Sequence, residues 1–328
     1  MSIKNIDLGS KMNFGNARRA GYSLATQKEN ILTEEQENIV RIQIDKLESA
    51  PEEWNFYPAL QGEEFDRLVH SILVHGLLHP IVVQKKQDKT MILSGHNRVR
   101  AYRFIRSKIQ ELKSAQQEEL NGVDITQLNV KDFDEIYAII KEDLSEEDAR
   151  EIIIDANYAQ RQLGQKLLTR SIIEKYKIIQ QKRKENTGDY KSRKTREIVA
   201  ESFQMSGRHI DRYRKLEKLN PILLDWFYKG KISLEMGAKI AMMKSNIQEE
   251  IAEHYLPFIL KYPAQTLQYF KAGMTKKELA EMKQEILDEK NICKISFVRD
   301  GVHHSVTLQE ESQIEEMISL LKTWNIEC

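Results

Sequence analysis

The sequence predicts a multidomain α+β protein with a small mixed α/β domain, an all-α middle domain and a short C-terminal ββα module. Strand-like and helix-like periods alternate over residues 38–162, the pattern is purely helical over 163–289, and a hairpin signal followed by a helical period occupies 290–328. Residues 1–37 are polar and rich in glycine, so they offer little apolar surface to bury and are expected to form a flexible tail. The length of 328 residues also exceeds the usual length of a domain with a single hydrophobic core.

The composition is that of globular domains with polar surfaces. Apolar residues make up 41% of the chain and charged residues 30%. No stretch approaches the roughly 20 apolar residues that a membrane span needs, so no membrane partner is expected. The two cysteines, Cys293 and Cys328, lack the spacing of a zinc site or a disulfide framework. A cytoplasmic location is therefore the expectation.

The net charge is zero, but the charges are unevenly distributed along the chain. Between Lys166 and Lys231 there are 18 Lys and Arg residues and 8 Asp and Glu residues, which gives this segment +10 and the remainder −10. A basic middle between acidic flanks is typical of one DNA-facing domain held by others. The alternative interpretation is a solvated helical surface.

The first domain combines short strands with helices. Val40, Ile42 and Ile44 alternate with polar residues, which predicts a half-buried strand. Phe65 to Leu73 has helical spacing, and Gly76 is expected to end that helix. The remaining elements predicted here are strands at 80–83, 91–93 and 136–140, helices at 97–108 and 145–154, and an inserted helix and loop near 107–134.

The last forty residues predict a hairpin followed by a helix. Asp300-Gly301 is a two-residue turn signal that would place Phe297 opposite His304 and Ile295 opposite Val306. So small a module buries too little surface to stand alone, which favours a homodimer, with packing onto the middle domain as the alternative. The helix would begin with a Ser312–Glu315 capping box and carry an apolar stripe of Ile314, Met317, Ile318, Leu321 and Trp324.

The segment from Thr195 to Leu219 has the pattern of a helix-turn-helix. Thr195 is a candidate N-cap, and Ala200 is a small residue at the point where two helices would cross. Ile210 and Tyr213 follow at the spacing that brings them into the same small core. Gln204 stands in the turn where glycine is common, so the turn must accept a side chain. A plain helical hairpin in a bundle is the alternative.

The basic residues of this segment suit contact with double-stranded DNA. Arg and His side chains on the second helix can donate to guanine or to phosphate, and the cations that precede the first helix suit backbone phosphates. The predicted DNA-binding residues are Lys191, Arg193, Lys194, Thr195, Arg196, Ser206, Gly207, Arg208, His209, Arg212 and Lys215.

A candidate phosphate-binding turn lies between the predicted strand at 91–93 and the helix that follows. Gly95 lets backbone N–H groups approach an anion, and the start of the next helix favours negative charge. Arg98 and Arg100 add cations whose geometry suits phosphate oxygens. Surface ion pairs are the alternative interpretation of both arginines.

The order of these motifs resembles ParB/RepB-like partition proteins, as found on plasmids and integrative mobile elements. Gly95 to Ala101 is similar to the GxxRxRA box of the ParB N-terminal domain, which has a sulfiredoxin-like fold. Residues 155–161 are similar to the family's ENxQR box, and Gly230 to Leu234 to the element that follows its helix-turn-helix. The segment before the first box also matches, at Phe65-Asp66, Ser71-Ile72, Gly76 and Pro80-Ile81-Val82-Val83.

The resemblance implies a DNA clamp gated by a nucleotide. Such proteins form homodimers, load at a DNA site, bind CTP with Mg in the N-terminal domain and hydrolyse it slowly. It also implies nucleoid or plasmid association and a ParA-like ATPase that contacts the N-terminal tail, where Arg18 and Arg19 are the candidates. The implied nucleotide-binding residues are Ser94, Gly95, His96, Asn97, Arg98, Arg100, Asn157, Gln160 and Arg161.

The sequence departs from the family pattern at three places. Residues 60–64 contain no arginine before the Phe65-Asp66 pair. His96 and Asn97 stand where acidic and basic residues are usual, and Ala156 stands where the third box has Glu. Asp155 is the candidate for the missing carboxylate and hence for a catalytic role.

Two other functions are consistent with the sequence. A helix-turn-helix transcription regulator with a degenerate first domain would explain the missing carboxylates. A ParB-like nuclease would need a metal site, for which His70, His75, His79 and His96 are the available side chains. A sulfiredoxin-like reaction is excluded because no cysteine lies near Gly95.

Overall fold

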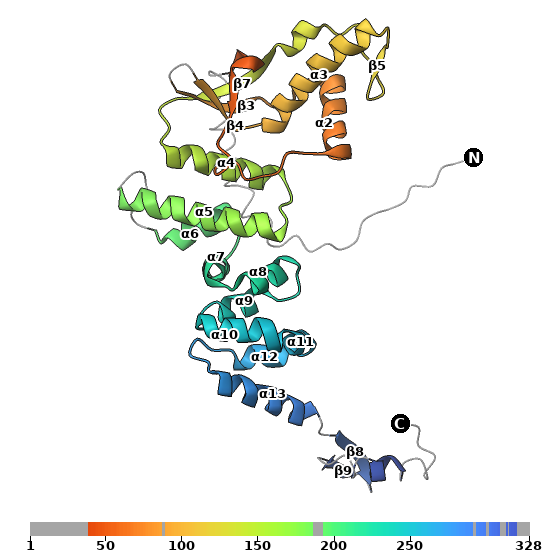
Figure 1. The fold of residues 1–328 in the computed structure, drawn as a ribbon, viewed down its shortest axis with the longest axis vertical. Coiled ribbons are helices and arrows are strands. Elements are labelled where there is room, and N and C mark those ends of the chain that lie inside the picture. Colours follow the sequence, from red (N-terminus) through yellow and green to blue (C-terminus); the bar gives the residue numbers. More distant parts are fainter. Residues whose placement is uncertain are drawn as a thin grey trace, which may run out of the picture. The chain divides into compact units, whose positions relative to one another are not determined.

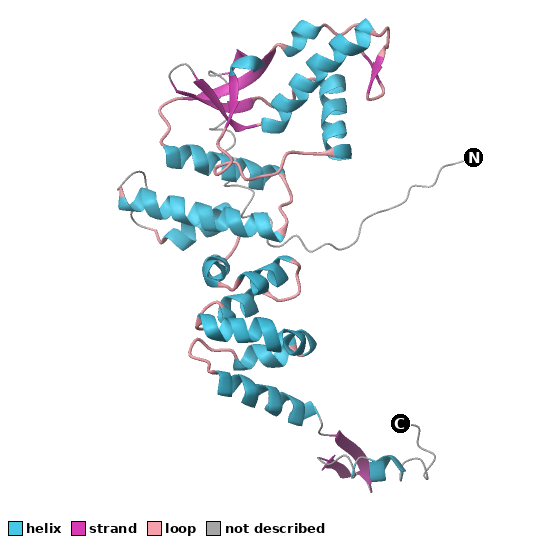
Figure 2. Ribbon diagram, viewed as in Figure 1, coloured by secondary structure: helices cyan, strands magenta, loops and turns pink. Residues whose placement is uncertain are grey.

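The computed structural model describes residues 39–86, 89–185, 193–290, 293–299, 302–308, 313 and 315–319. The chain divides into two compact units, residues 1–161 and 162–328, and each is described by itself. The tail predicted for residues 1–37 lies outside the described residues. Strands occur in the first unit and in a hairpin near the C-terminus, and the described segments between them are helical (Figure 2).

The first unit contains a five-stranded mixed sheet (Figure 1). Its strands run in the order β1-β7-β3-β4-β2. The pairs β1–β7 and β3–β4 are antiparallel, and the pairs β7–β3 and β4–β2 are parallel. The strands are β1 (Ile39–Gln43), β2 (Leu47–Ser49), β3 (Ile81–Lys86), β4 (Lys89–Ser94) and β7 (Glu135–Lys141).

Helices complete the core of this unit. The helices are α2 (Gly62–His75), α3 (His96–Ser114) and α4 (Glu146–Gln160), with a short 3-10 helix η2 (Ile44–Lys46) between β1 and β2. Helix α2 packs against α3, and α4 packs against β4. Apolar residues of α2, including Val69 and Ile72, share one buried cluster with Ile81 of β3 and Ile105 of α3.

Several predicted element boundaries are confirmed. Helix α2 ends at Gly76, whose positive φ of 69° closes the helix as predicted. Ser145 caps α4 by accepting a hydrogen bond from the backbone N–H of Asp148 at 3.0 Å. The sequence alone predicted both because each end carries a residue type with a specific capping geometry.

Two predictions for this unit are wrong. Val40 is 37% exposed although its alternation with Ile42 and Ile44 predicted burial, because β1 lies at the edge of the sheet. The insert near 107–134 is not only a helix and a loop. It contains the end of α3, a hairpin of β5 (Glu119–Leu120) and β6 (Val123–Asp124), and a 3-10 helix η3 (Val130–Phe133). Three spaced apolar residues anchor this polar segment to the core, namely Leu120, Ile125 and Phe133.

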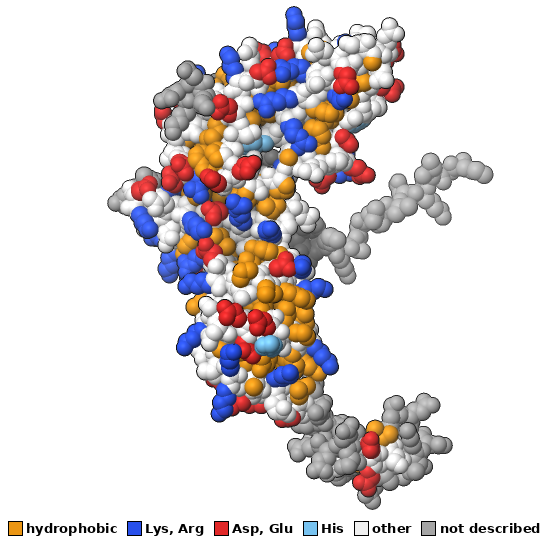
Figure 3. All heavy atoms as spheres, viewed as in Figure 1, with side chains coloured by type: hydrophobic (Ala, Val, Ile, Leu, Met, Phe, Trp, Pro, Cys, Tyr) orange, Lys and Arg blue, Asp and Glu red, His pale blue; other side chains and the backbone are white. Residues whose placement is uncertain are grey.

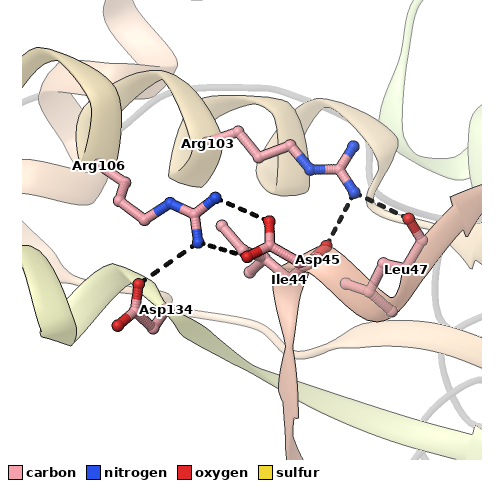
Figure 4. Close-up of polar contacts among 6 residues, drawn as sticks. All are labelled: Ile44, Asp45, Leu47, Arg103, Arg106 and Asp134. Atoms are coloured by element: carbon pink, nitrogen blue, oxygen red, sulfur yellow. Dashed lines mark hydrogen bonds and ion pairs between the residues drawn. The ribbon is translucent and has the colours of Figure 1, made fainter.

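Two arginines of α3 attach this helix to the chain around β2 (Figure 4). Arg103 donates to the carbonyl oxygens of Ile44 and Leu47, both at 2.8 Å. One turn further on, Arg106 forms a bidentate ion pair with Asp45 at 2.7 and 2.9 Å and reaches Asp134 at 3.4 Å. Ion pairing with Arg106 lowers the pKa of Asp45. These bonds fix the rotation of α3 about its axis, and hence the face on which Arg100 and Arg103 lie.

The second unit is helical from α5 to α13, as predicted for 163–289. The absence of strands there holds for the described residues 162–185 and 193–290. Its helices are α5 (Gln165–Lys184), α6 (Thr195–Ser202), α7 (Gly207–Lys215), η4 (Leu216–Lys218), α8 (Pro221–Tyr228), α9 (Leu234–Ile240), α10 (Ser245–Glu250), η5 (Ile251–Tyr255), α11 (Leu256–Lys261), α12 (Pro263–Tyr269) and α13 (Lys276–Lys290).

The C-terminal hairpin has the predicted register. Strand β8 (Cys293–Arg299) pairs antiparallel with β9 (Val302–Leu308), with Phe297 opposite His304 and Ile295 opposite Val306. The predicted turn residues Asp300-Gly301 lie outside the described residues, as do Ser312, Ile314, Leu321 and Trp324 of the predicted helix. Residues 313 and 315–319 are helical.

A side chain at position 95 should destabilise the first unit. Gly95 has φ = 102°, and a Cβ there would lie 2.5 Å from Cγ2 of Ile81. We expect Gly95→Ala to lower the free energy of unfolding by roughly 2 kcal/mol or more, through backbone strain and overpacking. Gly273→Ala is the control because a Cβ at position 273 meets nothing within 4 Å. Chemical denaturation would measure both, and equal stability of the two variants would contradict the strained turn.

Candidate functional site

The turn between β4 and α3 is the centre of the candidate site in the first unit. Ser94 ends β4, Gly95 adopts a left-handed conformation, and His96 begins a 19-residue helix. The first N–H groups of an α-helix have no acceptor within the helix and carry its positive dipole end. No acidic residue occupies the first turn of α3. This backbone therefore offers a place for an anion.

A cavity of about 450 Å³ lies at this turn. Its walls come from the segment before α2, the end of β4, the start of α3 and the end of α4. The structure brings together at this one cavity all the residues for which a nucleotide-binding role was predicted, namely Ser94, Gly95, His96, Asn97, Arg98, Arg100, Asn157, Gln160 and Arg161. Their role in binding stays a prediction.

Neutral polar side chains join the walls of the cavity. The side-chain oxygen of Asn97 accepts a hydrogen bond from the backbone N–H of Leu60 at 3.0 Å, which ties α3 to the segment before α2. Gln160 of α4 donates to the hydroxyl of Ser94 at 3.4 Å. Asn157 donates to the carbonyl oxygen of Ile153 within its own helix at 2.8 Å, which orients its amide.

Backbone carbonyls hold two of the arginines. Arg98 donates to the carbonyl oxygens of His79 and Pro80 at 2.6 and 2.8 Å, and Arg161 donates to that of Pro58 at 2.8 Å. Burial lowers the pKa of both guanidinium groups. Carbonyl oxygens orient a cation without neutralising its charge, so both positive charges remain available to an anion.

Two further arginines line the cavity from the same face of α3. Arg100 lies over the ring of Phe65, with its guanidinium carbon 3.9 Å from the ring centroid. Arg103, three residues further on, is held by the two carbonyls of the β2 region. Within the described part of the chain, none of the four arginines lies within ion-pair distance of a carboxylate. The cavity thus carries four cations that a ring and carbonyl groups hold in place.

His96 is half-buried, and its imidazole is unprotonated at neutral pH. Its Nε2 lies 3.4 Å from the backbone N–H of Ala50, which donates to it. Burial, and then the charge of Arg161, lower the pKa of His96 to about 4. The imidazole is therefore a neutral wall of the cavity, and it adds no positive charge to the site.

Sequence reasoning missed part of this cavity. Asn55, Tyr57 and Leu60 line it from a segment that has neither helical nor strand-like periodicity. Arg103 was also missed, although its spacing of three from Arg100 places both on one helix face and could have revealed it. Asp155, the candidate catalytic residue, is exposed and is not among the residues that line the cavity.

The residues present do not fit a bound Mg ion. Mg prefers carboxylate oxygens, and the charged side chains that line the cavity are all arginines. Nor do the described residues contain a cluster of three His, Cys, Asp or Glu side chains that could hold a metal. His70, one of the four histidines considered for a nuclease, instead lies 3.1 Å from the carbonyl oxygen of Asn121 through its Nδ1.

In the second unit, α6 and α7 form a compact pair joined by residues 203–206 and packed on α5. Val199, Ala200, Ile210 and Tyr213 are buried, the last three being the residues predicted to meet at the crossing. Gln204 has a positive φ of 50°, so the turn accepts a side chain in the conformation that glycine usually adopts.

Of the two predicted N-caps in this helix pair, the one of α7 is confirmed and the one of α6 is not. Ser206 caps α7, and its hydroxyl accepts from the backbone N–H of His209. The prediction that Thr195 is the N-cap of α6 is wrong, because Lys194 occupies that position. Thr195 is instead buried in the first turn, where its hydroxyl accepts a hydrogen bond from Arg183 at 3.0 Å.

The basic residues of this pair divide into paired and unpaired groups. Arg193 pairs with Glu201 at 2.7 Å, Arg196 with Asp211 at 3.0 Å, and Arg212 with Glu235 at 3.1 Å. The side chains of Lys194, Arg208 and Lys215 are exposed and have no ion pair within the described residues. Gly207 and His209 lie in the first turn of α7, with His209 exposed, and Lys191 lies outside the described residues.

A basic groove adjoins the start of α6. It has a volume of about 640 Å³, and four of its side chains are cationic, which is consistent with the Lys and Arg side chains that gather over α5 and α6 in Figure 3. The residues that line it are Tyr176, Gln180, Arg183, Lys184, Lys194, Thr195, Arg196 and Asp211.

Comparison with known families identifies the first part of the chain. Residues 28–121 match the model of the ParB N-terminal domain, a segment that contains the β4–α3 turn. This part of the chain is similar to ParB N-terminal domains. A curated relative, the probable chromosome-partitioning protein ParB of Campylobacter jejuni, is 29% identical over 123 residues, which are 32% of this chain and 42% of the relative. The chain thus spans about two-fifths of the length of that ParB.

Two solved ParB structures, both of C-terminally truncated chromosome-partitioning ParB from Caulobacter crescentus, are also similar to the chain. One is complexed with the centromeric parS site; it is 16% identical, covers 75% of this chain and 99% of its own, and has a TM-score of 0.40. The other is complexed with CTP-gamma-S; it is 17% identical, covers 66% of this chain and 98% of its own, and has a TM-score of 0.26.

The low pKa of His96 should make the first unit less stable in acid. The unfolded chain takes up a proton on His96 below pH 6.5, whereas the folded chain does so only near pH 4. Stability from the neutral imidazole is thus present above pH 6.5 and lost as the pH falls to about 4. We expect His96→Gln to reduce this loss by on the order of 1–3 kcal/mol, measured by urea unfolding at several pH values. His254→Gln, at an exposed site in the other unit, is the control, and identical pH profiles for wild type and His96→Gln would contradict the assignment.

Proposed function

We propose that the chain is a ParB-like partition protein that binds a specific DNA site through α6 and α7 and CTP in the cavity at Gly95. The observation that carries the nucleotide part is the convergence of residues from two boxes, 94–100 and 157–161, on one cavity with four arginines. The ParB N-terminal domain match covers the first of these boxes. The neutral polar groups Asn97, Asn157 and Gln160 are suited to hydrogen bonds with a base or a ribose.

The geometry of α6 and α7 supports a helix-turn-helix that reads double-stranded DNA. The apolar side of α7 is buried, while Arg208, His209 and Lys215 are exposed. A helix that projects from a small core in this way can enter a major groove. The cations of the adjoining groove, Lys184 and Lys194 among them, suit the phosphates on either side.

The domain organisation that we propose for the whole chain is consistent with a role in partition. We assign residues 38–162 to the nucleotide domain, 163–289 to DNA binding and 290–328 to a ββα module that joins two copies in a homodimer. Partner binding by the N-terminal tail, through Arg18 and Arg19 and a ParA-like ATPase, concerns residues outside the described part of the chain. The protein would then lie at the nucleoid or on a plasmid in the cytoplasm. None of the described helices has the length and apolarity to cross a membrane.

Arg208 is the side chain whose loss should weaken specific DNA binding most clearly. We expect Arg208→Ala to cost roughly 1–3 kcal/mol of binding to the cognate site, because a base or phosphate contact is lost. Arg212→Ala should weaken binding as well, but Arg212 must first exchange Glu235 for the DNA. Fluorescence anisotropy at fixed salt would measure both effects, since such affinities depend steeply on salt.

Arg67→Ala provides a matched control for Arg208→Ala. Arg67 is an exposed arginine on α2 in the other unit, and its side chain is 72% exposed. It should bind DNA as the wild type does. If Arg208→Ala and Arg67→Ala gave the same affinity, α7 would not be the recognition helix.

Arg161 should contribute to nucleotide binding without carrying much of the fold. Its side chain donates a hydrogen bond to the carbonyl oxygen of Pro58 and lines the cavity. We expect Arg161→Ala to lower the affinity for CTP by about tenfold, or roughly 1.4 kcal/mol. Isothermal titration with CTP and with ATP, in the presence and absence of cognate DNA, would measure this, with Arg150→Ala on α4, the helix that ends just before Arg161, as control. A wild type that binds DNA but neither nucleotide would favour the transcription regulator, and cleavage of plasmid DNA would favour the nuclease.

A further inference from the structure

The charged side chains that line the cavity at Gly95 are all of one sign. Arg98, Arg100, Arg103 and Arg161 surround the start of α3, and each is half-buried. Their hydrogen-bond partners are carbonyl oxygens and the serine hydroxyl at position 94, and the ring partner of Arg100 is Phe65. Four cations and a helix N-terminus therefore face the space without a counter-charge among its lining residues.

Carboxylates near this cavity lie outside its lining. Glu64, an exposed residue of α2, acts on Arg161 only through the longer-range attraction that raises the pKa of that arginine against the effect of burial. Asp155 is exposed on α4. The position on α4 that does line the cavity is the next one, Ala156, which offers a methyl group in place of a metal ligand.

This charge distribution determines which form of a triphosphate the cavity favours. A free nucleoside triphosphate carries more negative charge than its Mg complex, because the cation neutralises two of the phosphate charges. Guanidinium groups bind phosphate oxygens with bidentate hydrogen bonds and gain more from the uncomplexed anion. A divalent cation bound between the phosphates would meet the arginines as like charges, which are repulsive in a partly buried site.

We propose that this cavity holds the triphosphate of its nucleotide by arginines alone, without a divalent cation. The proposal rests on the proposed function, since it takes the cavity to be the CTP site. Magnesium then brings no gain in affinity, and no carboxylate of the cavity is available to position a metal for hydrolysis. The bound nucleotide acts as a stable ligand of the first unit.

Titration calorimetry with CTP, in EDTA and in MgCl₂ at matched ionic strength, tests this proposal on the full chain. The affinity of the wild type for CTP in EDTA should equal or exceed its affinity in MgCl₂, or fall below it by no more than about threefold. Ala156→Glu places a carboxylate in the cavity wall. This variant should lose about tenfold or more of its affinity in EDTA and regain it in MgCl₂.

Ala159→Glu is the matched control, because Ala159 lies on the same helix but is exposed and does not line the cavity. It should behave as the wild type does. Binding by the wild type that requires MgCl₂ would overturn the metal-free site and leave CTP binding intact. A loss in EDTA of the same size for Ala156→Glu and Ala159→Glu would overturn it too, because the phosphates would not lie beside this wall. An absence of CTP binding in both buffers would overturn the proposed nucleotide function along with it.

Discussion

The left-handed turn at Gly95 is the constraint on which the candidate nucleotide site depends. Because position 95 has no side chain, the chain can pass close to Ile81 and begin α3 directly at the end of β4. This places the free N–H groups of the helix at the cavity and brings Arg98, Arg100 and Arg103 into its walls. A larger residue would displace the start of α3 and with it both the amides and the cations. The bonds from Arg103 and Arg106 to the β2 region then hold the helix in this rotation.

Charge is used differently in the two units. In the first unit, carbonyl oxygens and an aromatic ring orient four arginines while leaving their charges uncompensated, so an incoming anion encounters a nearly full positive field. In the second unit, three of the predicted DNA-binding arginines are tied to carboxylates, whereas Arg208 and Lys215 extend into solvent. The first arrangement suits one compact polyanion held at fixed points. The second suits a long polyanion that is scanned by exposed side chains, and the paired arginines can exchange partners when phosphates approach.

Much of the fold could be predicted because its signals are local. Gly76, Ser145 and Ser206 mark helix ends by residue types with one capping geometry, and the two-residue turn signal Asp300-Gly301 in the sequence predicted the register of the hairpin. Predictions failed where tertiary context decides. Val40 alternates like a buried strand residue but lies on an edge strand, and Thr195 can cap a helix but is used instead as a buried acceptor. The local turn predicted Gly95, Arg98 and Arg100 as anion ligands, and the resemblance to the family's boxes extended this set to the nine residues that line the cavity. Asn55 and Tyr57 come from a segment without periodicity and could not be predicted. The partners of Arg98 and Arg212 are distant in sequence. The sequence alone therefore could not predict which arginines form ion pairs and which do not.

Backbone amide chemical shifts would test the central claim most directly, which is that the start of α3 receives the phosphates of a nucleotide. The measurement is a ¹⁵N-TROSY titration of the full chain with CTP. The account predicts that the amides of Gly95, His96 and Asn97 show the largest changes and saturate together with Arg161. Changes confined to other parts of the chain, with the amides of residues 95–97 unmoved at saturation, would contradict it.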